Sequence, residues 1–209
     1  MYAINIEKIV NGSFQENGYI VWETQSKIAI LFDPGDESNK FIQIIEDLEL
    51  KPIGIYATHG HVDHIGAVSR LCIHFSIPFY IHQNDKDLVN SLPEYCEYFG
   101  ITKADPPEIE GYISEEDEIM LAENEVHIIE TPGHTQGGVC YLIGNHLISG
   151  DTLFNKSIGR TDLPGGNYNQ LIESIKTKLL ILDDKVIVYP GHGENTTIDQ
   201  EKASNPFLS

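Results

Sequence analysis

The sequence has few basic side chains. Its 209 residues include 13 lysines and arginines against 32 aspartates and glutamates, which gives a formal net charge of -19 at pH 7. Nucleic acids and anionic membrane surfaces are recognised through clusters of lysine and arginine, so we expect neither as a partner. The acidic residues are scattered, as in "EDLE" (46–49) and "SEEDE" (114–118), which is typical of a solvated acidic surface.

Cysteine and long hydrophobic runs are also scarce. Cys72, Cys96 and Cys140 are widely spaced, odd in number and form no CxxC pair, which favours small buried side chains in a reducing compartment over a disulfide framework. No run approaches the roughly 18 apolar residues of a membrane span. The N-terminal "MYAINIEKIV" has no basic segment followed by an apolar one. We therefore expect no signal peptide and a cytoplasmic location.

Short β-branched runs that lead into glycine-containing loops are frequent. There are five of them, at residues 28–32, 53–57, 126–130, 146–149 and 186–189. Runs of this length predict buried strands. The following loop lies at the C-terminal end of each expected strand, and each of the five loops carries histidine or aspartate. Layered α/β proteins tend to build their sites at this edge.

Apolar residues with helical spacing occur between these strands. One stripe follows a candidate cap at Ser38, a second runs through residues 65–75, and a third runs through residues 172–182. Thr197 and Gln200 have the spacing of a capping box, which predicts a short C-terminal helix.

Strand-like runs at residues 2–7 and 18–23 complete the pattern, and residues 83–117 give no clear pattern beyond a loop at 105–112. The alternation of strands and helices predicts a layered α/β fold in one domain, residues 1–209.

The segment "THGHVDH" (58–64) holds four metal-ligating side chains in six positions: His59, His61, Asp63 and His64. The two histidines that are two residues apart can point the same way from an extended turn. A single tetrahedral zinc could not use all four together with distant ligands without strain. Two neighbouring metals could, because adjacent residues would then serve different ions.

Three further strand-end loops extend the candidate ligands to seven. "TPGHT" contributes His134, "GDT" contributes Asp151 and "PGH" contributes His192. Seven ligands divide as three for each of two metals plus one bridging carboxylate, and the two oxygen faces of Asp151 suit the bridge. Nitrogen and oxygen donors without cysteine favour zinc, iron or manganese over a structural thiolate site.

Two other residues are candidates for bracing the ligand loop. Asp33 ends an expected strand, where its carboxylate either supports the ligands or forms part of a "DPG" turn. Thr58 is expected to brace the loop through its hydroxyl. The remaining histidines have no candidate ligand near them in sequence and are expected to be structural: His74, His82, His127 and His146.

These motifs, in this order, resemble those of the metallo-β-lactamase superfamily, and the resemblance covers nearly the whole chain. "GDTLFNKSIGRTDLPGG" (150–166) and "GHGENTTIDQEKASNPFL" (191–208) are similar to small glyoxalase II-type hydrolases, which are hydroxyacylglutathione hydrolase-like. The resemblance implies an αββα sandwich with a dinuclear site, most simply of zinc, at one edge. It assigns His59, His61 and His134 to the first metal. It assigns Asp63, His64 and His192 to the second, with Asp151 as the bridge.

The resemblance is weaker for the thiol that carries the substrate. Longer glyoxalase II enzymes have a C-terminal helical extension that contributes to glutathione binding, and this sequence ends about ten residues after its last capping box. Arg160 falls where those enzymes place a basic residue for a glutathione carboxylate. The alternative is that Arg160 pairs with Asp162 inside its loop.

The ligand set and the resemblance together predict a hydrolase for a small-molecule thioester such as S-D-lactoylglutathione. In this mechanism a metal-bridging hydroxide attacks the carbonyl and Asp63 also orients the nucleophile.

One alternative is a persulfide dioxygenase of the same superfamily, which uses one iron held by His59, His134 and Asp151. "LPGG" after "GRTD" and the C-terminal segment favour hydrolysis. A flavin-linked diiron oxidase is disfavoured because His61 stands where that group carries glutamate. A metal-binding module without catalysis is the third alternative.

Overall fold

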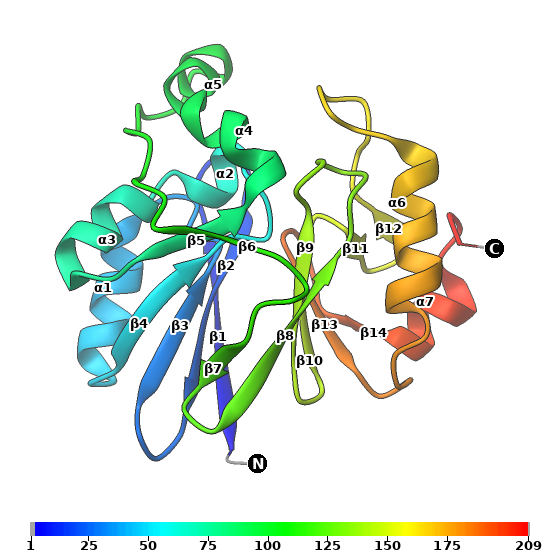
Figure 1. The fold of residues 1–209 in the computed structure, drawn as a ribbon, viewed down its shortest axis with the longest axis horizontal. Coiled ribbons are helices and arrows are strands. Elements are labelled where there is room, and N and C mark those ends of the chain that lie inside the picture. The colour runs from blue at the N-terminus through cyan, green and yellow to red at the C-terminus, as the bar shows by residue number, and fades with distance from the viewer. Residues whose placement is uncertain (1–2, 209) are drawn as a thin grey trace.

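The computed structural model describes residues 3–208, and two six-stranded sheets face each other within it. Helices cover the outer face of each sheet, so the molecule has four layers (Figure 1). The αββα sandwich expected from the sequence is confirmed. Within the described range, no helix has the length and apolar character needed to cross a membrane.

The first sheet begins as an antiparallel meander and continues with parallel strands. In spatial order it contains β1 (Ile4–Asn11), β2 (Glu16–Glu23), β3 (Ile28–Phe32), β4 (Lys51–Tyr56), β5 (Phe79–His82) and β6 (Gly111–Ile113). The strands from β3 to β6 are parallel to one another. Consequently the loops that follow β3 and β4 open at the same edge.

The second sheet brings three more strand ends to one edge. In spatial order it contains β14 (Thr196–Thr197), β13 (Ile187–Pro190), β10 (His146–Gly150), β9 (Val139–Ile143), β8 (Asn124–Glu130) and β7 (Ile119–Leu121). β8 and β10 are each antiparallel to β9, and β13 is parallel to β10. β8, β10 and β13 therefore end at the same side. A two-stranded hairpin, β11 (Leu153–Phe154) with β12 (Ser157–Ile158), follows β10.

The helices fall into three groups. The first sheet is covered by α1 (Ser38–Asp47) and α3 (Val68–Phe75), and the second by α6 (Tyr168–Ser174), its π-helical continuation η2 (Ile175–Leu179) and α7 (Ile198–Ser204). The site edge carries the short α2 (Val62–Ile65), the 3₁₀ turn η1 (Gln83–Asp85), α4 (Lys86–Asn90) and α5 (Leu92–Phe99).

Alternating residues on the central strands separate three hydrophobic layers. On β2, Ile20 packs toward the helices of the first sheet while Tyr19 and Val21 pack between the two sheets. On β9, Tyr141 packs between the sheets, whereas Cys140 packs toward α6 and α7. Strands that are buried on both faces consist almost wholly of apolar residues, and this explains why these runs stand out in the sequence.

The five expected strands are present as β3, β4, β8, β10 and β13, and Thr197 caps α7 by accepting a hydrogen bond from the backbone N–H of Gln200. Of the expected strand at residues 2–7, Tyr2 lies outside the described residues, Ala3 precedes β1, and residues 4–7 belong to β1.

Three helix predictions were wrong in detail. Ser38 is the first residue of α1 and not its cap; Glu37 holds the cap position in a left-handed conformation (φ 46°) without a side-chain cap. The apolar stripe at 65–75 is interrupted between α2 and α3, where the backbone N–H of Ala67 donates to the carbonyl oxygen of Pro34 at 3.0 Å and not to the preceding helical turn. The stripe at 172–182 continues as π helix, which changes its period.

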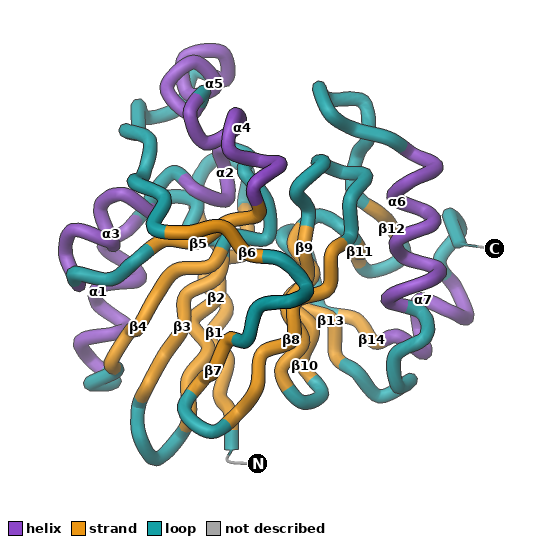
Figure 2. The backbone as a smooth tube through the Cα atoms, in the orientation of Figure 1, coloured by secondary structure: helices purple, strands orange, loops and turns teal. Residues whose placement is uncertain are grey.

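Residues 83–117, which gave no clear pattern, contain η1, α4 and α5 and then a long loop before β6 (Figure 2). These helices are short, and the helical spacing of Leu92, Tyr95, Cys96 and Phe99 in α5 is a sequence signal that was missed. The three cysteines are free as expected; Cys96 and Cys140 are buried, but Cys72 is only partly covered.

Candidate metal centre

Three imidazole rings form the first group of candidate ligands. Nε2 of His134 lies 3.2 Å from Nε2 of His59 and 2.9 Å from Nδ1 of His61. Two nitrogens bound to one tetrahedral zinc are about 3.3 Å apart, given bonds of about 2.0–2.1 Å. Burial, followed by the neighbouring imidazoles, lowers the pKa of His59; burial and His134 lower the pKa of His61 to about 3. The rings of His59 and His61 are therefore neutral at pH 7 and offer lone pairs to a metal.

The second group contains a carboxylate and two imidazoles. Oδ2 of Asp63 lies 3.3 Å from Nε2 of His192 and 3.9 Å from Nε2 of His64. Burial alone would raise the pKa of Asp63, but His64 and His192 outweigh that effect and lower it. The carboxylate is ionised and is available as an oxygen ligand.

Asp151 stands between the two groups and turns one oxygen toward each. Its Oδ2 lies 3.6 Å from Nε2 of His134, while its Oδ1 lies 3.4 Å from Nε2 of His64 and 3.7 Å from Nε2 of His192. Within residues 3–208, Oδ1 of Asp151 and Nε2 of His64 are buried without a hydrogen-bond partner. Buried polar atoms are normally satisfied. A metal ion bound between them would satisfy both atoms, so the donor set fits a dinuclear centre.

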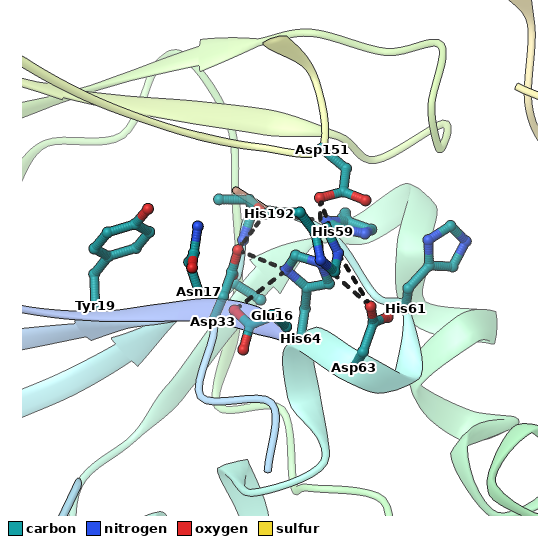
Figure 3. A network of polar contacts seen from close by, with 12 residues as sticks. Glu16, Asn17, Tyr19, Asp33, His59, His61, Asp63, His64, Asp151 and His192 are labelled. Carbon is teal, nitrogen blue, oxygen red and sulfur yellow. Dashed lines mark hydrogen bonds and ion pairs between the residues drawn. The ribbon is translucent and has the colours of Figure 1, made fainter. Parts of the chain in front are cut away.

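Strand direction explains why side chains far apart in sequence meet here. The loop after β4 and helix α2 carry the ligands between residues 59 and 64, and His134, Asp151 and His192 follow β8, β10 and β13. In Figure 3, Asp151 descends from one sheet toward the histidines and Asp63 of the other. The structure therefore brings all seven predicted ligands to one edge. Gly191 permits the approach of the last loop, because a Cβ there would lie 2.3 Å from Oδ1 of Asp151.

The two candidate bracing residues contact each other and the ligands. Oδ1 of Asp33 accepts a hydrogen bond from the backbone N–H of Thr58, and Oδ2 accepts one from its hydroxyl, both at 2.6 Å. Oδ2 also lies 3.0 Å from Nδ1 of His64, and the hydroxyl of Thr58 lies 3.1 Å from Nδ1 of His59. These contacts fix both imidazoles through their distal nitrogens, so that each Nε2 points into the centre.

The backbone of the Arg160 loop supports a third imidazole. Nδ1 of His134 lies 2.7 Å from the carbonyl oxygen of Arg160, a distance at which the ring N–H donates to that oxygen. The tautomer that places the proton on Nδ1 leaves Nε2 free to ligate. Arg160 therefore contributes its backbone to the centre, a role that its position in the sequence does not reveal.

Sequence reasoning missed Asp85, which ties two ligand loops together. Its Oδ2 accepts hydrogen bonds from the backbone N–H of Gly60 at 2.9 Å and the hydroxyl of Thr135 at 2.8 Å, while Oδ1 accepts one from the N–H of Gly137 at 2.7 Å. Burial raises the pKa of Asp85, and these hydrogen bonds oppose the shift. Asp85 lies in the 3₁₀ turn of the segment that showed no pattern, so no sequence signal was present to find it.

Strand β2 supports the loop that carries His192. The side-chain amide of Asn17 donates to the carbonyl oxygen of Pro190 at 2.9 Å, and the hydroxyl of Tyr19 donates to the same oxygen at 2.6 Å. Figure 3 shows both side chains on this strand beside the centre. They determine where the loop after β13 begins.

A cavity of about 840 Å³ opens over the centre. His61, Asp63, His134, Asp151 and His192 all reach it. The guanidinium of Arg160 also lines it, but Nε donates to Oδ1 of Asp162 at 2.7 Å and Nη2 donates to Oδ2 at 2.9 Å. Arg160 therefore has both of the arrangements that the sequence left open: it lies at the cavity, and it pairs with Asp162.

The other four histidines lie outside this cluster and have separate neighbours. Nε2 of His74 lies 3.5 Å from Glu46, Nε2 of His82 lies 3.5 Å from Glu130, and Nδ1 of His127 lies 3.3 Å from Glu125. Nδ1 of His146 lies 3.0 Å from the hydroxyl of Tyr189.

The fold and the edge site define a class: a four-layered α/β protein whose histidine and aspartate side chains can hold two metal ions. The model of the family described as "Metallo-beta-lactamase superfamily" matches residues 11–192, and the chain belongs to this family. The resemblance in the motifs is thereby confirmed.

One curated relative and two solved structures are similar over nearly the whole chain. "Hydroxyacylglutathione hydrolase GloC" of Haemophilus influenzae is 41% identical and covers 99% of each chain. The structure of the BLEG-1 B3 metallo-beta-lactamase superposes with a TM-score of 0.91 at 36% identity, covering 98% of this chain and 100% of that one. TTHA1623 in a di-iron-bound form superposes with a TM-score of 0.89 at 35% identity, covering 97% and 100%.

These comparisons define the chemistry at a coarse level. The chain is a metallo-hydrolase of this superfamily, with histidine and aspartate groups able to hold a dinuclear metal site. The similar structure with two irons shows that this architecture is not restricted to zinc.

Proposed function

We propose that the protein hydrolyses a thioester in the manner of glyoxalase II, with S-D-lactoylglutathione as the representative substrate. The observation that carries the proposal is the position of Asp151, which turns one oxygen toward each ligand group. The similarity to a hydroxyacylglutathione hydrolase over the full chain supports the same reaction.

The ligand sets follow from the two groups. His59, His61 and His134 would hold one metal, and Asp63, His64 and His192 would hold the other, with Asp151 shared. The nitrogen and oxygen donors favour zinc, with iron or manganese also compatible. Two such ions supply Lewis acidity and lower the pKa of a coordinated water toward neutrality.

The chain itself contributes orientation. Asp63 keeps 18% of its side chain exposed and lines the cavity, where its ionised carboxylate can accept a hydrogen bond from the attacking water and hold it in line with the carbonyl. The hydrogen bonds of Asp33 to Thr58 and His64 keep the neighbouring imidazoles fixed while this happens. A thiolate leaves easily, so the reaction needs no strong general acid.

The proposal is tested by metal analysis together with turnover of S-D-lactoylglutathione. We expect two metal ions per chain and measurable hydrolysis, both of which are reduced in His59→Ala. His127→Ala is the matched control, because His127 is 54% exposed and lies outside the cluster. If His59→Ala kept full metal content and full turnover, the assigned centre would be wrong.

A mononuclear-iron persulfide dioxygenase is the second candidate, since Nε2 of His134 lies within 3.2 Å of His59 and 3.6 Å of Asp151, which is the set that one iron would use. A single ion of that kind would leave Asp63, His64 and His192 without a metal although they are equally assembled. Elemental analysis separates the two: one iron per chain with consumption of oxygen and a persulfide would replace the hydrolase proposal.

A further inference from the structure

The cavity above the metal centre is lined by aromatic and aliphatic side chains on two sides. One side is the aromatic wall, which we define as Phe14, Tyr95, Tyr98 and Phe99. The other side is provided by the β11–β12 hairpin and the loop after it, including Phe154, Ile158 and Leu163. In Figure 1, α5 and the segment after β12 rise on opposite sides of the site edge.

Phe99 is the centre of the aromatic wall. Its ring contacts that of Phe14 edge to face, with centroids 5.5 Å apart, and that of Tyr98 edge to face at 5.0 Å; Tyr95 is stacked at 6.5 Å. Three of these rings remain substantially exposed: Phe99 at 38%, Phe14 at 39% and Tyr98 at 80%. Exposed aromatic surface gathered at the mouth of a site is typical of a ligand-binding surface.

The cavity has little positive charge of its own to offer an anionic ligand. Arg160 is the single lysine or arginine among the described residues that line it, and two of its five N–H donors, one on Nε and one on Nη2, are directed to Asp162. Glu94 adds a negative charge to the same lining. The net charge of -19 over the whole chain acts in the same direction.

Glutathione fits this lining poorly. The glutathione part of the thioester carries two carboxylates and one ammonium group. A carboxylate that is buried away from water needs a charged or hydrogen-bonding partner. A flat apolar group would instead cover Phe99 and its neighbours, and removal of apolar surface from water is favourable.

On the basis of the thioester hydrolysis proposed above, we propose that the aromatic wall selects the thiol half of the substrate by apolar contact, so that thioesters of uncharged, aromatic or extended apolar thiols are preferred over thioesters of glutathione. The metal centre acts on the thioester group, and Phe99 with its neighbours holds the carrier.

This inference is tested with three lactoyl thioesters that differ only in the thiol. The three thiols are 3-phenylpropane-1-thiol, N-acetylcysteamine and glutathione. All three are alkyl thiols, but glutathione gives the best leaving group and the phenylpropyl thiol the poorest. Each kcat/KM is therefore divided by the rate constant for alkaline hydrolysis of the same thioester before the thioesters are compared. We expect kcat/KM for the phenylpropyl thioester to exceed that for the N-acetylcysteamine thioester by about tenfold or more, chiefly through KM. The glutathione thioester should not exceed the N-acetylcysteamine thioester. A clear preference for the glutathione thioester would overturn the inference while leaving thioester hydrolysis in place.

Substitutions in the aromatic wall test whether these residues cause the preference for the phenylpropyl thioester. Phe99→Ala should lower the ratio of kcat/KM for the phenylpropyl thioester to that for the N-acetylcysteamine thioester by about fivefold or more. Phe207→Ala is the matched control, since Phe207 is 42% exposed and is not part of the cavity lining. The ratio cancels any loss of correctly folded enzyme, so an unchanged ratio in Phe99→Ala would contradict the assignment.

Absence of turnover would separate the two proposals. If none of the three thioesters is hydrolysed by the metal-loaded protein, thioester hydrolysis is wrong. The selectivity of the cavity is then measured by the binding of two inert thioethers, methyl 3-phenylpropyl sulfide and S-methylglutathione. Tighter binding of the first supports the apolar carrier site, and equal or tighter binding of the second overturns it.

Discussion

Asp33 and His64 are 31 residues apart in sequence, yet Oδ2 of Asp33 lies 3.0 Å from Nδ1 of His64 inside the protein. The aspartate adopts a left-handed backbone conformation (φ 47°) at the end of β3, which turns its carboxylate under the ligand loop. The same oxygen accepts the hydroxyl hydrogen of Thr58. Asp33 thus connects the first sheet to ligands of both groups.

Replacement of this carboxylate tests its role in holding the metal. Asp33→Asn keeps one acceptor oxygen but loses the charge, so the imidazole of His64 is less firmly oriented and less basic. We expect metal affinity at the second group to fall by about 10–100-fold, measured by competition with a chelator. Asp47→Asn, at the exposed end of α1, is the control. Unchanged affinity in Asp33→Asn would show that the contact is only structural.

The hydroxyl of Thr58 is expected to stabilise the folded protein, and valine and serine substitutions separate its effect from that of the methyl group. It donates to Asp33 at 2.6 Å and lies 3.1 Å from Nδ1 of His59, and the side chain is buried. Thr58→Val keeps the shape but removes these contacts, which should cost about 1–3 kcal/mol in the free energy of unfolding. Thr58→Ser should recover most of the loss. Denaturant unfolding of both variants checks this, and a loss in Thr58→Ser without a loss in Thr58→Val would assign the role of Thr58 to packing.

The pKa of Asp85 predicts a pH dependence of stability. Burial raises this pKa above its value in the unfolded chain, against the opposing hydrogen bonds from Thr135 and Gly60. The folded protein therefore holds the proton more tightly, and ionisation of Asp85 reduces stability as the pH rises from about 4 through the folded pKa.

Asp85→Asn replaces the carboxyl group, which ionises, with an amide that does not, and it leaves one acceptor oxygen in place of two. At pH 4 the variant should be less stable than the wild type by about 1–3 kcal/mol, and the difference should narrow as the pH rises toward 7. Unfolding in denaturant with a chelator present measures both proteins in the same metal-free state. A difference that widens with pH would contradict the raised pKa.

Removal of the metal should destabilise the protein through the atoms that it leaves unsatisfied. Oδ1 of Asp151 and Nε2 of His64 have no other partner within the described part of the chain. At free metal about 100-fold above Kd, the metal-loaded form should be more stable than the chelated form by about 2.7 kcal/mol. Asp151→Asn should reduce this difference strongly, whereas Asp199→Asn should not. A melting temperature that is insensitive to metal would count against a centre at this edge.

The sequence identifies the ligands because each one follows a buried strand, and strands that share a direction end at the same edge. Their convergence can therefore be predicted without coordinates, as can a layered α/β fold, whereas the αββα sandwich was implied by the family resemblance. The supporting residues cannot be predicted in this way. Asp85 and Asn17 hold ligand loops through backbone groups of segments far away in sequence, and the choice of partner depends on how the chain is packed.

The lining of the substrate cavity could not be predicted from the sequence either. Phe14 lies in the turn between β1 and β2, and Phe99 ends α5, so only the tertiary structure places their rings 5.5 Å apart. In α5, Leu92, Tyr95, Cys96 and Phe99 have helical spacing, but this spacing does not show which other segment the helix faces. The motif "GRTD", by contrast, led to two alternative expectations for Arg160, a place at the site and a pairing with Asp162, and the structure contains both.

The pairing of Arg160 with Asp162 leads to the last prediction. The hydrogen bonds from Arg160 lower the pKa of Asp162 to about 2, so the carboxylate is ionised at neutral pH and accepts from two of the five N–H donors of the guanidinium, on Nε and Nη2. Asp162→Asn would release that guanidinium toward the cavity. We expect kcat/KM for lactoylglutathione to rise by about threefold to tenfold relative to the N-acetylcysteamine thioester, because an exposed charge pair contributes about 1 kcal/mol or less and a partly desolvated one contributes more.

Asp162→Glu, which retains the charge, should leave that ratio near the wild-type value, and the gain in Asp162→Asn should diminish at high salt. A fall in the ratio for Asp162→Asn would instead mean that Asp162 holds Arg160 in the position from which it already binds the substrate. The sign of the change therefore distinguishes an arginine that is withheld from the ligand from one that is presented to it.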